Sequence, residues 1–355
     1  MTFSARALLM AILLVASWSV PALAEGKEER DDGIRWLAPA PRTNDGRFTN
    51  PIGPLAHGTV GVRLPFFFRR IGAAFDTRPG APVYEGSGGA FLRAPIDSPR
   101  VTWIGHATVL VEMDGIRFLT DPTWSETASP VSFAGPPRLA PPGVALEALP
   151  PIDFVVVSHN HFDHLDLATL VRLAERDPLT QFLVPLGNGK LLREAGISRV
   201  LELDWTETTR IGDVVVYCLP VQHWSKRSLF DDDRALWSSW AVIGPTRRFY
   251  YGGDTGYFTG FREIGAAHGP FDLAVLPIGA YAPREMMIES HMNPEEAWQA
   301  ALDLEATVAL GVHYGTFDLA DEPSDEPPRR FRAKARLDER EADAWVLRIG
   351  EGRRF

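Results

Sequence analysis

The stretch "SHNHFDHLD", residues 158–166, decides how the rest of this sequence is understood. It places three histidines and two aspartates in nine positions, directly after the apolar run "IDFVVV" at 152–157. A lone histidine beside a core is usually a hydrogen-bonded structural residue. Burying several imidazoles and carboxylates without partners, however, is costly for each group. A divalent metal removes that cost, because zinc takes neutral imidazole nitrogen and carboxylate oxygen as ligands.

The positions of further polar residues support a metal site. Four apolar runs each end in a ligand-type side chain, and these are His159, His223, Asp254 and His313. Because ligands of α/β proteins bind at the carboxyl ends of strands, we expect these ends to meet at one rim. His159 and His161 are two positions apart and can point the same way from an extended segment, whereas Asp163 and His164 can serve a second metal.

Alternating strands and helices predict an α/β fold. "ATVLVEMDGIRFLTDP" (107–122) is typical of a hairpin that turns at Asp114-Gly115. Helices are predicted over 165–176, with Asp166 as the cap, and over 293–304, with Asn293 as the cap. The further predicted strands are rich in Val and aromatic residues, and they are "DFVVVSH", "DVVVYCLPVQH", "RRFYYGGD", "FDLAVLPIGAY" and "ATVALGVHYG".

The chain divides into three parts by composition. Residues 1–24 have the layout of a secretory signal peptide, which predicts an exported protein, periplasmic or secreted, with an uncleaved membrane anchor as the alternative. Residues 25–98 are rich in Gly, Pro and Arg and are expected to wrap over the main domain, residues 99–355.

Composition excludes some functions. With 45% hydrophobic residues in 355 positions, the chain can bury a large core. A formal net charge of −10 argues against nucleic-acid binding. The single cysteine, Cys218, cannot form an internal disulfide and is predicted to be a buried strand residue.

Two segments invite functional interpretations. "VRLPFFFRR" (62–70) is expected either to pack on the core with its arginines in water or to contact a membrane surface. The proline-dense stretch 130–151 can be neither helix nor central strand, so it is a candidate lid or wall of the site.

The His-x-His-x-Asp-His pattern, followed by His, Asp and His at long intervals, resembles the metallo-β-lactamase superfamily. The likeness narrows to the N-acyl-phosphatidylethanolamine-hydrolysing phospholipase D family. It rests on segments spread over roughly residues 47–322, and these are "RFTNP", "VTWIGHATVLVEMDGIRFLTDP", "VSHNHFDHLD", "PVQHWSKRSLFDDDRALWSSWAV", "YYGGDTGYF", "GPFDLAVLPIGAYAPR", "HMNPEEA" and "HYGTFDLADE".

This resemblance implies a four-layer αβ/βα sandwich with two Zn²⁺ or similar divalent ions. One ion would take His159, His161 and His223, the other Asp163, His164 and His313, and Asp254 would bridge both. Asp121 would support the site, and His291 would lie beside the metals. The role of His106 is left open between support of the site and packing. His57 and His268 are expected to be structural or exposed.

The implied activity is hydrolysis of N-acyl-phosphatidylethanolamine-like phospholipids to phosphatidic acid and N-acylethanolamine by a hydroxide shared between the metals. Asp163, Asp254 and His291 are the candidate catalytic residues. Candidate substrate residues are Ser132 and Phe133, where mammalian members carry Gln-Tyr, and Tyr281. The alternatives are a small-molecule hydrolase of the L-ascorbate-6-phosphate lactonase type and a non-catalytic metal-binding envelope protein. The expected partner is a phospholipid with peripheral membrane contact, and a homodimer is left open.

Overall fold

The computed structural model of the chain describes residues 35–73, 80–83, 98–130 and 135–355. The predicted signal peptide (1–24) and the candidate substrate residues Ser132 and Phe133 lie outside the described residues.

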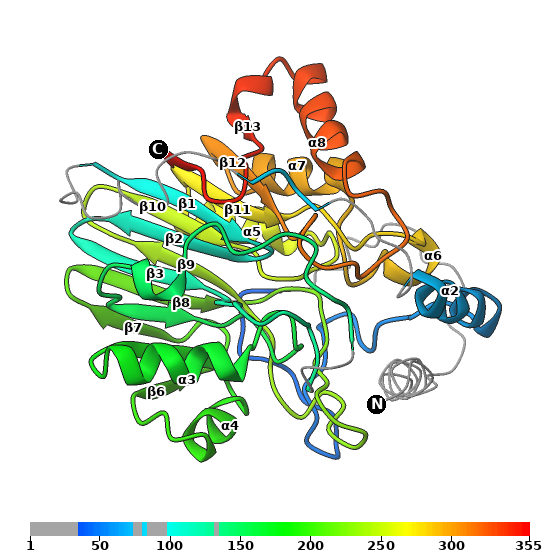
Figure 1. The fold of residues 1–355 in the computed structure, drawn as a ribbon, viewed down its shortest axis with the longest axis horizontal. Coiled ribbons are helices and arrows are strands. Elements are labelled where there is room, and N and C mark those ends of the chain that lie inside the picture. The colour runs from blue at the N-terminus through cyan, green and yellow to red at the C-terminus, as the bar shows by residue number, and fades with distance from the viewer. Residues whose placement is uncertain (1–34, 74–79, 84–97, 131–134) are drawn as a thin grey trace.

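Two seven-stranded mixed sheets form the centre of the molecule (Figure 1). In spatial order the first sheet holds β14 (Gly352–Arg354), β1 (Arg100–Gly105), β2 (Thr108–Met113), β3 (Ile116–Thr120), β4 (Phe154–Val156), β5 (Gln181–Pro185) and β6 (Val200–Leu203). The second holds β13 (Ala344–Trp345), β12 (Val308–Val312), β11 (Leu273–Pro277), β10 (Arg248–Tyr251), β9 (Ser239–Ile243), β8 (Val214–Leu219) and β7 (Thr208–Ile211).

Each sheet changes from antiparallel to parallel pairing near its middle. β1, β2 and β3 pair antiparallel, and β3 to β6 pair parallel. In the second sheet β7 to β10 pair antiparallel, and β10 to β13 pair parallel. The predicted hairpin is confirmed, since Asp114 and Gly115 join β2 to β3 with φ of 48° and 80°.

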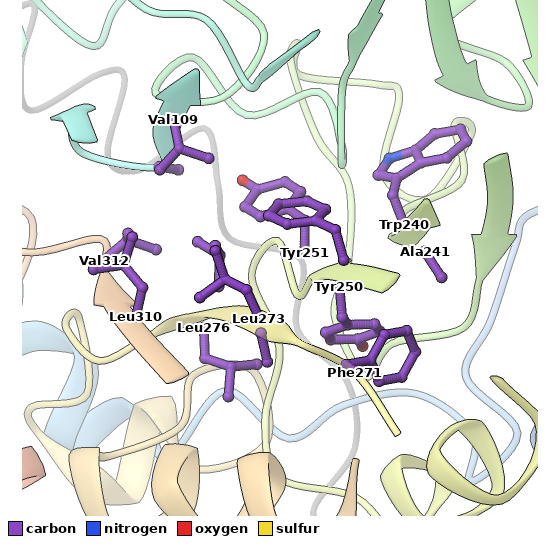
Figure 2. Close-up of a cluster of buried hydrophobic side chains, with 14 of the residues drawn as sticks. Val109, Trp240, Ala241, Tyr250, Tyr251, Phe271, Leu273, Leu276, Leu310 and Val312 are labelled. Atoms are coloured by element: carbon purple, nitrogen blue, oxygen red, sulfur yellow. The ribbon is translucent and has the colours of Figure 1, made fainter. Parts of the chain in front are cut away.

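Successive side chains of a strand point alternately to the two faces of its sheet, and this alternation produces the layers. Val156 of β4 points into the core between the sheets, whereas Val155 and Val157 pack on the outer face with Leu170 of a helix. Because neighbouring side chains of a strand point to opposite faces, both faces of this sheet are apolar. Figure 2 shows part of the inner core, where Tyr251 and Val312 of the second sheet lie near Val109 of β2.

Helices cover the outer faces of both sheets. Those over the first sheet are α3 (Leu167–Arg176) and α4 (Gly189–Glu194), and those over the second are α5 (Gly260–His268), α7 (Pro294–Asp303) and α8 (Glu326–Leu337) (Figure 1). Short helices are α6 (Arg284–Met287) and the 3₁₀ turns η2 (Leu146–Ala148) and η3 (Glu341–Asp343). Asp166 caps α3, and Asn293 forms a capping box with Glu296 at α7, as predicted. The layers are therefore those of an αβ/βα sandwich.

The segment at 62–70 agrees in part with the first of its two interpretations, since Phe66 and Phe67 are buried. It lies in a helix, α2 (Val60–Ala73), with Pro65 inside it. Its arginines are not all in water, because Arg70 is buried, pairs with Asp318 at 2.7 Å and donates to the Ala320 carbonyl. Those contacts hold a helix that the local sequence does not favour. In the described part of the chain, no helix is both long and apolar enough to cross a membrane.

Described residues that precede the first sheet in the chain contact the main domain. The Trp36 backbone N–H donates to Glu263 of α5, and the Phe48 N–H donates to the Asp233 carbonyl. Cys218 is buried in β8, as predicted. From 135 to 151 the only helical turn is η2, which agrees with the expectation of an irregular segment there.

Candidate metal centre

The strand ends converge. The loop 158–166 leads from β4 into α3, and His223, Asp254 and His313 each follow a strand of the second sheet. The loop turns tightly because the Leu165 N–H donates to the His161 carbonyl at 2.8 Å. Gly253 lets β10 deliver Asp254, since its φ is +60° and a Cβ there would lie 2.5 Å from the Ser158 Cβ.

Three histidines form the first cluster of nitrogens. His161 Nδ1 lies 2.7 Å from His159 Nε2 and 3.3 Å from His223 Nε2. His159 and His223 are fully buried, and His161 is half-buried. These are the three residues that the resemblance assigns to one metal.

The second cluster holds one carboxylate and two imidazoles. Asp163 Oδ2 lies 3.3 Å from His164 Nε2 and 3.4 Å from His313 Nε2, and the two nitrogens are 3.0 Å apart. This is the set that the resemblance assigns to the other metal.

Asp254 lies between the two clusters. Its Oδ2 is 3.1 Å from His164 Nε2 and 4.0 Å from both His159 Nε2 and His223 Nε2, and its Oδ1 is 3.1 Å from His313 Nε2. A carboxylate in this position can reach a cation in either cluster, which is what a bridging ligand requires.

Hydrogen bonds fix the outward nitrogens of two of the ligands, His164 and His223. His164 Nδ1 contacts Asp121 Oδ2 at 2.6 Å, and His223 Nδ1 donates to the Ser290 carbonyl at 3.0 Å. Asp121 also accepts hydrogen bonds from the Ser158 N–H and hydroxyl and from the Tyr251 hydroxyl. Such contacts select the tautomer that turns the other ring nitrogen toward the centre. Asp121 therefore supports the site, as expected.

His106 supports the second cluster. Its Nε2 is 2.9 Å from Asp163 Oδ2, and its carbonyl accepts a hydrogen bond from the His313 N–H. His106, Asp121 and His313 all have positive φ, at 51°, 34° and 63°. Non-glycine residues in this region carry backbone strain that the surrounding contacts must hold. Three residues of this site therefore carry such strain.

The other candidate residues take different positions. His291 is half-buried beside the centre, with Nδ1 3.8 Å from Asp254 Oδ2. Tyr281 is buried and donates its hydroxyl to Glu326, so its role toward a substrate stays a prediction. His57 is half-buried against Trp224, at 5.2 Å between ring centroids, and His268 packs similarly on Tyr217.

Sequence reasoning missed two residues of the site. The Asn50 side chain donates to the His223 carbonyl at 2.9 Å and accepts from the His223 N–H at 3.2 Å. The Trp224 ring lies 4.4 Å from the His161 ring. "RFTNP" drew attention as part of the resemblance, but nothing in its spacing indicates a contact 173 positions away.

The charges of the cluster fit divalent cations. Burial lowers the pKa of His161 to about 4, and it lowers those of His159 and His223 well below the ordinary range, so these rings are neutral at pH 7. Burial alone would also lower the pKa of His313, but Asp254 and Asp163 outweigh it and raise this pKa to about 9. The carboxylates of Asp163 and Asp254 therefore favour positive charge beside them.

Two buried atoms of the centre also point to a cation. Within the described residues, Asp254 Oδ1 and His291 Nδ1 have no hydrogen-bond partner. A cation would satisfy the carboxylate oxygen, and neutral imidazole with carboxylate is the donor set of zinc sites. The buried histidines and aspartates are therefore consistent with a binuclear metal site.

Comparisons with known proteins agree with this geometry. The model of the beta-lactamase superfamily domain matches residues 116–314, more than half of the chain. The chain belongs to the metallo-β-lactamase superfamily. Its buried His/Asp clusters, its fold and its similarity to a metal-dependent hydrolase of Methanopyrus kandleri indicate a metal-dependent hydrolase of this superfamily.

The chain is also similar to individual proteins of this superfamily. An uncharacterized protein of Mycobacterium tuberculosis (strain H37Rv) is 44% identical over 306 residues, which cover 83% of this chain and 80% of that protein. The N-acyl-phosphatidylethanolamine-hydrolyzing phospholipase D 1 of Caenorhabditis elegans is 46% identical over 228 residues, covering 61% of this chain and 64% of that enzyme.

Solved structures confirm the fold. A metallo hydrolase from the archaeon Ignicoccus hospitalis superposes with a TM-score of 0.56 at 22% identity, over 73% of this chain and 98% of that one. At this identity the likeness shows the metallo-β-lactamase fold and nothing about substrate.

Proposed function

We propose that this chain is a phosphodiesterase of the phospholipase D type that uses two zinc or similar divalent ions. Its substrates would be N-acyl-phosphatidylethanolamine-like phospholipids, which it would hydrolyse to phosphatidic acid and N-acylethanolamine. The observation that carries this proposal is the convergence of two ligand clusters on the carboxylate of Asp254. The similarity to the nematode phospholipase supports the choice of substrate.

Bound divalent ions would polarise the phosphoryl oxygens and lower the pKa of water toward neutrality. Asp163 is held by His106 and is the partly exposed member of the second cluster, so it is placed to orient the attacking water. Water attacks phosphorus, the bond from phosphorus to the N-acylethanolamine oxygen breaks, and that oxygen takes up a proton. His291 is placed either to donate a hydrogen bond to a phosphoryl oxygen or to supply that proton.

The surface of α2 supports contact with a lipid bilayer. Val60, Leu64 and Phe68 are spaced four residues apart, so they share one helix face, and they are 69%, 45% and 61% exposed. The other face packs through Phe66 on Met287 and Ala280, close to the segment that carries His291. An apolar stripe beside the mouth of a lipid-hydrolysing site would bring the substrate to the metals.

Isotope-labelled water tests the chemistry. Purified protein is incubated with N-acyl-phosphatidylethanolamine in mixed micelles and water enriched in ¹⁸O, and the products are measured by mass spectrometry. Attack at phosphorus places the label in phosphatidic acid and none in N-acylethanolamine. No turnover, or label in the N-acylethanolamine, contradicts the proposal.

Acyl-chain length separates the proposal from the lactonase alternative. A phospholipase should discriminate between acyl chains of different length, whereas a small-molecule hydrolase should be indifferent to them.

Replacing Asp254 with Ala should remove bound metal and turnover together. Metal analysis of this variant that gave the wild-type content would contradict the bridging role.

Vesicle sedimentation tests the bilayer contact. Leu64→Ser should weaken binding to phosphatidylethanolamine vesicles, because it places a hydroxyl in the apolar stripe. Leu179→Ser is the matched control, since Leu179 is 76% exposed and lies between α3 and β5. Equal binding by both variants would rule out α2 as the contact surface.

A further inference from the structure

The loop that carries four of the metal ligands is held at its backbone by one arginine. Nη1 of Arg227 donates to the Asn160 carbonyl and to the Leu165 carbonyl, both at 2.9 Å. These carbonyls flank His161, Asp163 and His164 along the chain. Asn160 and Leu165, which carry the carbonyls, are both buried. Within the described residues, no other hydrogen bond to either carbonyl oxygen is present.

The guanidinium also contacts the loop through a side chain. It lies over the Phe162 ring, with the guanidinium carbon 4.2 Å from the ring centroid. A planar cation can stack on a ring and donate two in-plane hydrogen bonds at once, which a lysine ammonium cannot reproduce. Arg227 therefore contacts the loop at its start, its middle and its end.

The backbone of Arg227 is fixed as well. It follows His223 by four residues, and its N–H donates to Asp231 Oδ1 at 3.1 Å. The Ser228 N–H donates to the same oxygen at 2.7 Å, which closes the turn. In the described part of the chain, no ion pair joins the Arg227 guanidinium to a carboxylate, so its donors remain directed at the loop.

We propose that Arg227 is a positioning residue that sets the affinity of this centre for its metals by holding the ligand loop in its binding conformation. Without Arg227, two buried carbonyls lose their partner, and the loop relaxes toward conformations that satisfy them elsewhere. Metal binding must then reorder the loop, so part of the binding free energy is lost. The inference concerns the loop and is independent of the substrate.

A zinc competition titration against a chromophoric chelator tests this proposal. Metal-free Arg227→Ala should bind zinc about 10- to 100-fold more weakly than the wild type, the range seen when outer partners of ligands are removed. Arg227→Lys keeps the charge but loses the planar group that stacks on Phe162 while it donates to both carbonyls, so its affinity should fall between the two. If the alanine variant does not fold, the lysine variant decides alone, and unchanged affinity in it refutes the proposal.

Chemical rescue separates positioning from general stability. Arg227 lines a cavity of about 790 Å³ together with Asn160 and Phe162, so a small cation can reach the vacated position. Guanidinium, well below denaturing concentrations, should restore zinc affinity to Arg227→Ala and leave the wild type unchanged.

Arg234→Ala is the matched control. Arg234 lines the same cavity but donates to the Asp45 carbonyl, away from the ligand loop, so its loss should not change zinc affinity. If Arg227→Ala lowers the unfolding free energy of the metal-free protein but binds zinc like the wild type, the arginine is only structural and the inference is wrong.

Discussion

Asn50 offers the most direct test of how the ligands are held. Its side chain is the hydrogen-bond partner of both backbone groups of His223, and it is only 3% exposed. Replacing Asn50 with Ala leaves a buried N–H and a buried C=O without partners. An orphaned buried polar group costs about 1–3 kcal/mol, so the two together predict a loss of roughly 2–6 kcal/mol of unfolding free energy.

Urea unfolding of the metal-free protein, followed by circular dichroism, measures this loss. Asn50→Asp keeps an acceptor for the His223 N–H but places a buried carboxylate oxygen against the His223 carbonyl, so it should not recover the stability that Asn50→Ala loses. Asn44→Ala is the control, since Asn44 is an exposed asparagine of the same segment and its change should stay within about 0.5 kcal/mol. If Asn50→Ala behaves like this control, the reasoning is refuted.

Three further outcomes are expected. Burial raises the pKa of Asp233 from 3.8 to about 6. The contribution of this group to the free energy of unfolding is therefore largest below pH 3.8, and it is lost as the pH rises through about 6. Asp233→Asn, which tolerates the φ of 53°, should therefore unfold with about 1–3 kcal/mol more free energy than the wild type at pH 8 and with no gain at pH 3.5. Tyr251→Phe removes a donor from Asp121 and should weaken zinc binding about 10-fold in a competition titration, with equal affinities speaking against the support role. Burial raises the pKa of the Cys218 thiol, so a thiol reagent should label it only on unfolding, and rapid labelling of the native protein would contradict its buried position.

Much of the site can be predicted from the sequence because its ligands follow strands. An apolar run ending in His159 or His313 identifies both a buried strand and the residue at its exit. Ligands of α/β proteins bind at the carboxyl ends of strands, so such exits are expected to meet, and here they do so from both sheets. The prediction fails where a contact has no local signature. Arg227 reaches the Asn160 carbonyl across 67 positions, and neither residue lies in a spacing that indicates the other.

The helix α2 was missed for a related reason. Pro65 and three consecutive phenylalanines do not follow the 3.6-residue period, so local pattern argues against a helix there. The helix is held instead by tertiary contacts, namely the ion pair from Arg70 to Asp318 and the packing of Phe66 on Met287. Tertiary contacts of this kind override weak local propensity.

Two of the residues that the sequence did not reveal, Asn50 and Arg227, share one role. The motif residues would bind metal through their side chains, whereas Asn50 and Arg227 bind the backbone beside those ligands. A backbone carbonyl offers the same acceptor whatever the residue, so such contacts leave no mark in the motif itself. Asn50 belongs to the segment predicted as a wrap over the main domain, yet it fixes the position of His223. The boundary predicted at residue 98 therefore divides the sequence by composition, but it does not divide the site.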